Sequence, residues 1–130
     1  MNYGFIKVAS AVPSVKVADC KYNVEQIEQQ IILAEGQGVE IIVFPELSLT
    51  GYTCQDLFRQ NLLLETTESA MLMLLDFTRQ LNIISIVGLP IAVGDLLLNC
   101  AAIIQKGQIL GIVAKEYLPN YNEFYEKRWF

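Results

Sequence analysis

The chain has 130 residues, a net charge of −5 and a mean hydropathy of +0.37. This length suits one domain with its own core, and a charged fraction of 18% excludes an intrinsically disordered chain. An acidic chain would be repelled by a phosphate backbone, so we expect no nucleic-acid partner. No apolar run approaches the roughly 20 residues that span a bilayer, so we expect no membrane partner either. The apolar fraction of 53% indicates that some apolar surface meets another chain or a further part of the protein.

The cysteine and histidine content limits which metal sites, disulfides and catalytic triads this chain can form. The three cysteines, Cys20, Cys54 and Cys100, form no CxxC pair, which disfavours a zinc ribbon or a disulfide framework and predicts no metal site. A reducing, cytoplasmic setting fits them best, and the N-terminus shows no signal-peptide pattern. The absence of histidine rules out Ser-His-Asp and Cys-His triads. Any proton transfer must therefore use a carboxylate, a lysine or a tyrosine.

Hydropathy patterns predict a strand, a helix and a second strand in the first third of the chain. Residues 4–12 alternate loosely and stop before a proline, which is typical of a strand. Residues 23–35 place apolar side chains at helical spacing, with Asn23 as the expected N-cap. Residues 40–44 form an unbroken apolar run, which indicates a strand buried on both faces.

The rest of the chain continues this alternation and then changes to a hairpin. We expect a helix over residues 67–81 and another buried strand over 83–88. Two further strands, over 96–104 and 108–115, flank Lys106–Gly107, a pair suited to a hairpin turn. Strands alternating with helices predict an α/β sheet with helices on at least one face.

An α/β sheet commonly carries its chemistry at the carboxyl ends of its strands. Glu46 follows one predicted strand, where a carboxylate next to an apolar core loses hydration and can act as a base. The alternative is a helix-capping or solvated glutamate. Lys115 ends another predicted strand, where it can stabilise developing negative charge or can simply protect a sheet edge. If the two strands are neighbours, both side chains share one crevice.

Two longer motifs are similar to one enzyme family. The segment VEIIVFPELSLTGYTCQDLF resembles the first signature of the nitrilase, or carbon-nitrogen hydrolase, superfamily. The closing segment KEYLPNYNEFYEKRWF resembles the lysine signature of one branch, the glutaminase domains of glutamine-dependent NAD⁺ synthetases. The opening FIKVASAVP and Asn99 also fit, so the resemblance covers essentially the whole chain.

This resemblance implies a fold and a set of roles. Members fold as an αββα sandwich, of which residues 1–130 would form about the first half, and they use a Glu-Lys-Cys triad. By resemblance, Glu46 is the general base and Lys115 stabilises the tetrahedral intermediate. Glu123 is the match for a second glutamate that positions the lysine or the substrate. Tyr52 and Tyr121 fall where the branch lines its glutamine pocket.

The family's nucleophile lies beyond the lysine, after another strand. Residues 1–130 are therefore expected to be the N-terminal portion of a glutamine amidotransferase domain, truncated before the cysteine nucleophile and inactive alone. Cys54 is the only cysteine near Glu46 in sequence, so it is the alternative nucleophile; the ordinary role for it is a small buried thiol. An isolated half-sandwich would also leave one face of its sheet uncovered.

The resemblance also implies partners. Glutamine would be the substrate, and the ammonia released would serve the ATP-dependent amidation of deamido-NAD⁺ in a synthetase domain. ATP and Mg²⁺ are expected only for that domain, and no cofactor is expected for these residues. The remainder of the domain, the synthetase domain and a homo-oligomer are the expected partners. Two alternatives stay open: another carbon-nitrogen hydrolase, such as an ω-amidase or a ureidopropionase-like enzyme, or a non-catalytic binding or assembly module.

Overall fold

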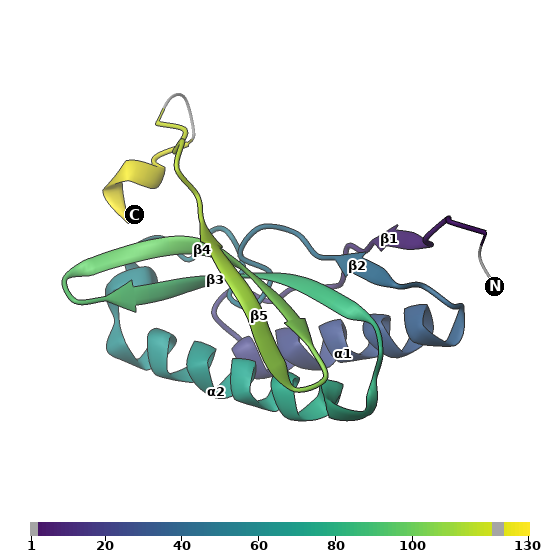
Figure 1. Ribbon diagram of the computed structural model, residues 1–130. Coiled ribbons are helices and arrows are strands. Elements are labelled where there is room, and N and C mark those ends of the chain that lie inside the picture. The colour runs from purple at the N-terminus through teal and green to yellow at the C-terminus, as the bar shows by residue number, and fades with distance from the viewer. Residues whose placement is uncertain (1–2, 121–123) are drawn as a thin grey trace.

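A five-stranded mixed sheet lies on two α-helices in the computed structural model, which describes residues 3–120 and 124–130 (Figure 1). The sheet has the order β1-β2-β3-β4-β5. The α-helices and strands are, in chain order, β1 (Val8–Ser10), α1 (Cys20–Gly36), β2 (Ile41–Val43), α2 (Asn61–Phe77), β3 (Ile84–Val93), β4 (Leu96–Gln105) and β5 (Gln108–Ala114). Short 3₁₀ helices are η1 (Gln55–Arg59), η2 (Thr78–Gln80) and η3 (Glu126–Arg128). The predicted α/β class and the predicted order of elements are confirmed.

Strand direction sets which strand ends share an edge. β1, β2 and β3 are parallel, whereas β3–β4 and β4–β5 are antiparallel hairpins. β5 therefore runs in the same direction as β2 and β3. As a result, the carboxyl ends of β2 and β5, which the sequence predicts to carry Glu46 and Lys115, point to the same side of the sheet.

β3 is longer than the predicted strand 83–88. It continues through Pro90 to Val93 and turns into β4 at Gly94, whose φ is +58°. The last residue of β2, Val43, pairs with Ile86, so beyond this point β3 has a pairing partner on one side only. A proline is tolerated in a strand that has a free side, because its missing N–H removes no ladder bond there.

Both helices begin earlier than predicted. α1 starts at Cys20 because Asp19 is the N-cap, its side chain accepting a hydrogen bond from Tyr22 N at 3.1 Å. The expected cap, Asn23, is wrong: it is buried inside the first turn, where its amide donates to the Lys16 and Leu49 carbonyls. α2 spans 61–77 rather than the predicted 67–81, and the chain continues directly from it into the 3₁₀ helix η2.

The core lies between the helices and one face of the sheet. Figure 1 shows α1 and α2 on the same side of the strands. The core includes Val24, Ile27, Ile31, Met71, Leu74, Ile42, Val87, Ala102 and Ile104. The opposite face is open, with Val8, Val43 and Val113 exposed by 61%, 41% and 61%. Within residues 3–120 and 124–130, no helix has the length and apolar character to cross a membrane.

Candidate active site

Glu46 is carried across the sheet by the segment that follows β2. Leu49 N donates to the Gly88 carbonyl at 3.0 Å, and Gly88 N donates to Ser48 Oγ at 3.1 Å. Gly88 has no side chain to block this approach, and a Cβ placed there would come within 2.3 Å of Leu47 N. The segment therefore lies directly on β3 and brings Glu46 towards β4.

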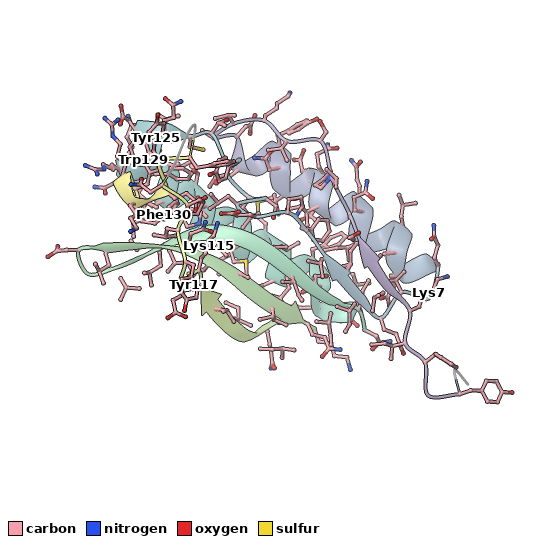
Figure 2. The ribbon with its side chains drawn as sticks, turned by 90° about the horizontal axis from the view of Figure 1, so that it is seen from above. Lys7, Lys115, Tyr117, Tyr125, Trp129 and Phe130 are labelled. Carbon is pink, nitrogen blue, oxygen red and sulfur yellow. The ribbon has the colours of Figure 1, made fainter. Side chains whose placement is uncertain are left out.

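Lys115 approaches the same point from β5. Its backbone N donates to the Asn99 carbonyl on β4 at 2.8 Å, and its Nζ contacts Glu46 Oε1 at 2.9 Å. The sequence prediction required neighbouring strands for this contact, but β3 and β4 separate β2 from β5. The two side chains meet because the Glu46 segment crosses β3. In Figure 2, Lys115 lies over the strands, with Phe130, Trp129 and Tyr125 of the C-terminal segment on one side of it.

A second carboxylate, that of Glu126 in η3, completes the cluster. Its Oε1 lies 2.9 Å from Lys115 Nζ, and its Oε2 accepts a hydrogen bond from the Tyr52 hydroxyl at 2.7 Å. The Glu126 side chain is only 4% exposed, so these two partners compensate its buried charge. Tyr52, expected at the substrate pocket, therefore lies beside the lysine.

The second glutamate predicted from the sequence, Glu123, lies outside the described residues, as does Tyr121. Among the described residues, Glu126 is the second glutamate on Lys115. The two glutamates stand three positions apart in the same aromatic-rich run, and their spacing from Lys115 did not distinguish them. The contacts that distinguish Glu126, to Lys115 and the Tyr52 hydroxyl, are tertiary, so no local signal in the sequence identified it.

Asn99 is the other contact of Glu46. Asn99 is 4% exposed, and its side chain donates from Nδ2 to Glu46 Oε1 at 2.6 Å. In the sequence, Asn99 fits the family resemblance, but no role for it was predicted. The hollow in front of this cluster, about 320 Å³, is lined by Glu46, Asn99 and Lys115 together with apolar residues of β2, β3, β4 and β5 and of the segment that follows β2.

The charges of the cluster keep Lys115 protonated. Partial burial lowers the pKa of its ammonium, but hydrogen bonds and charge from Glu126 and Glu46 outweigh this, and the pKa is raised above its ordinary value. A fixed ammonium beside a carboxylate can stabilise an oxyanion while the carboxylate accepts a proton. The arrangement therefore has a base and a cation suited to acyl transfer.

Cys54 does not join this cluster. The residue is 3% exposed, and its thiol donates to the Thr50 and Gly51 carbonyls, at 3.2 and 3.4 Å. Burial is the main cause that raises the pKa of Cys54, which disfavours the reactive thiolate. The contacts are those of a structural thiol. In the described part of the chain, no three side chains of histidine, cysteine, aspartate or glutamate gather as a metal site would require.

The family model for carbon-nitrogen hydrolases matches residues 7–130. This match covers nearly all of the chain, and the chain belongs to the carbon-nitrogen hydrolase family. The fold is the one expected from the resemblance.

Within this family, the chain is similar to glutamine-dependent NAD(+) synthetases. It is 35% identical over 127 residues to that of Mycobacterium tuberculosis and 41% identical over 114 residues to that of Aquifex aeolicus. These matches cover 98% and 88% of this chain but 19% and 20% of the relatives, so the chain spans about a fifth of their length.

Solved structures agree with this relationship. A glutamine-dependent NAD(+) synthetase from Cytophaga hutchinsonii superposes with a TM-score of 0.90 at 32% identity, over 96% of this chain and 21% of that one. A nitrilase-superfamily amidase from Nesterenkonia superposes with a TM-score of 0.79 at 22% identity, over 89% of this chain and 45% of that one. The second likeness establishes a shared fold only, and that fold is the nitrilase type.

Proposed function

We propose that this chain is part of the glutamine-hydrolysing domain of a glutamine-dependent NAD⁺ synthetase. The observation that carries the proposal is the 2.9 Å contact between Glu46 and Lys115, in a chain whose relatives at 35–41% identity are such synthetases. The chain supplies the base and the cation of a Glu-Lys-Cys triad. Its nucleophilic cysteine comes from a region beyond Lys115 in the longer protein.

In this reaction Glu46 accepts the proton of the cysteine thiol, and the thiolate attacks the amide carbon of glutamine. Lys115 stabilises the negative oxygen of the tetrahedral intermediate. As the carbon–nitrogen bond breaks, Glu46 returns its proton to the leaving nitrogen, and ammonia departs from a thioester. Water then hydrolyses the thioester. Glu126 holds Lys115 in place, and Tyr52, beside Glu126, contacts the substrate together with Tyr121.

The ammonia serves a synthetase domain that amidates deamido-NAD⁺. ATP and Mg²⁺ belong to that domain and not to the residues of this chain. The remainder of the glutaminase domain covers the open face of the sheet, and the whole enzyme works as a homo-oligomer in the cytoplasm. This open face, with its exposed valines, supports the need for a covering partner.

The experiment measures ammonia release by a longer protein that carries this chain and the cysteine. Glutamine is compared with an ω-amide of a 2-oxo acid and with a β-ureido acid, the substrates of the alternative hydrolases. Glu46→Gln and Lys115→Ala are each expected to lower turnover of glutamine by about 10²–10³-fold. Exposed Glu65→Gln and Lys21→Ala serve as matched controls.

Each outcome decides between the candidate functions. Preference for the ω-amide or the ureido acid would replace glutamine hydrolysis by another carbon-nitrogen hydrolase activity. Near-parental ammonia release by Glu46→Gln or Lys115→Ala would remove the role assigned to that residue. No turnover of any substrate by the parental protein would favour the non-catalytic module.

A further inference from the structure

The two oxygens of the Glu46 carboxylate have different environments. Oε1 accepts hydrogen bonds from Asn99 Nδ2 at 2.6 Å and from Lys115 Nζ at 2.9 Å. Within residues 3–120 and 124–130, Oε2 accepts no hydrogen bond. A carboxylate offers about four lone-pair positions over its two oxygens. Oε1 is thus occupied by two donors, whereas Oε2 has no donor in the part of the chain that the structure describes.

The position of Asn99 maintains the difference in hydrogen bonding between the two carboxylate oxygens of Glu46. It lies on β4 opposite Pro90, and its carbonyl accepts the backbone N–H of Lys115 at 2.8 Å. One buried residue therefore holds the side chain of Glu46 and the backbone of Lys115 together. Unlike an ammonium, its neutral amide cannot release its proton, so it fixes Glu46 without competing in proton transfer.

We propose that Asn99 is a positioning residue that, with Lys115, occupies Oε1 of Glu46 and leaves Oε2 as the atom that accepts the thiol proton. This inference rests on the proposed function above. An O–H bond forms at Oε2 as the S–H bond breaks, and the electron pair stays on sulfur. When the carbon–nitrogen bond breaks, the same proton passes from Oε2 to nitrogen, which restores the carboxylate.

The first test replaces the amide donor in the longer protein that contains the cysteine. Asn99→Leu removes the donor at similar volume, and Asn99→Asp keeps the shape while presenting an ionised acceptor. We expect each to lower kcat for glutamine by about 10- to 100-fold, with KM within about threefold, because displacement of a catalytic group chiefly slows chemistry. Gln105→Leu removes another β4 amide, which donates to the Asn82 carbonyl at 2.7 Å, and should keep the parental kcat.

A second test asks whether Asn99 acts through Glu46. The rate of alkylation of the nucleophilic cysteine by iodoacetamide reports thiolate formation without any amide substrate. Asn99→Leu should slow alkylation by about 10-fold in the parental protein and leave it unchanged in a Glu46→Gln background, because residues that act together are not additive. If thermal unfolding shows that Asn99→Leu is not folded, the same measurements on Asn99→Asp test the inference.

Three results would overturn the inference: a kcat within threefold of the parental value, an equal loss in Gln105→Leu, or equal slowing of alkylation in both backgrounds. A protein that releases no ammonia from glutamine, yet shows the expected coupling in alkylation, would contradict the proposed function and support the role of Asn99. The two proposals therefore fail independently.

Discussion

The Cα of Gly88 lies directly against the backbone of Leu47. A Cβ at position 88 would lie 2.3 Å from Leu47 N, 2.9 Å from the Pro45 carbonyl oxygen and 3.0 Å from the Glu46 carbonyl carbon. All three atoms are backbone, so no rotation of a side chain could relieve the contact. The position of Glu46 over β3 thus depends on the smallest residue type at one position of that strand.

Gly88→Ala should therefore displace the 45–48 segment and separate Glu46 from Lys115. We expect a loss of about 1–3 kcal/mol in the free energy of unfolding, the usual range for overpacking. Urea unfolding of the chain measures it. Gly36→Ala is the matched control, because it ends α1, has no neighbour within 4 Å of its new Cβ and lacks a left-handed φ. Equal stability of the two variants would contradict the prediction.

The contacts of Lys115 predict loss of stability at alkaline pH. The pKa of Lys115 is raised in the folded state by its contacts with Glu126 and Glu46. At a pH below the pKa of an unfolded-state lysine, about 10.4, these contacts contribute their full stabilisation to the fold. The contribution is lost as the pH rises through the higher pKa of the folded state. The urea midpoint of the parental chain should fall more between pH 9 and pH 12 than that of Lys115→Met.

The two proteins differ only at position 115, so the difference between the two curves reports the contribution of the lysine and its contacts. Parallel curves would show that the contacts with Glu46 and Glu126 do not favour the charged lysine.

The 130-residue chain by itself should release no ammonia from glutamine. Nucleophile, base and cation act as a unit, and the loss of one removes most of the rate. Cys54, the cysteine nearest Glu46 in sequence, is buried against backbone carbonyls, with a raised pKa. It should therefore resist iodoacetamide at neutral pH in the folded chain and react after denaturation. Ammonia release by the purified chain that disappears in Cys54→Ala would place the nucleophile inside these residues.

The open face of the sheet should make the isolated chain associate or bind a reporter dye. Val43 and Val113 are exposed on this face, opposite the helices. Val43→Glu combined with Val113→Glu should reduce both sedimentation coefficient and dye fluorescence, because charges disfavour contact between apolar faces. Leu72→Glu, at an exposed position of α2, is the control. A compact parental monomer that binds no dye would contradict this expectation.

Much of the fold follows from local patterns in the sequence. The apolar runs at 40–44 and 83–88 became neighbouring strands, and the turn at Lys106–Gly107 joins β4 to β5 as expected. The expected burial of residues 40–44 on both faces is wrong, because Ile42 faces the helices whereas Val43 is 41% exposed on the open face of the sheet. Boundaries were less well predicted where a tertiary partner decided them. Pro90 stays within β3 because β2 has already ended, and Asn23 is drawn into the core by the Lys16 and Leu49 carbonyls rather than capping α1.

The sequence by itself determined that a glutamate and a lysine each follow an apolar strand, because strand length and strand ends are properties of local hydropathy. Only the tertiary structure decided that these side chains meet across two intervening strands. That contact requires a glycine at position 88, because a Cβ there would collide with the backbone of the 45–48 segment where it packs on β3. Asn99 lies 53 residues from its partner Glu46 in the sequence, and Glu126 lies 11 residues from its partner Lys115. Hydrogen bonds of this kind exist only after folding has brought distant segments together, so no local pattern could specify them.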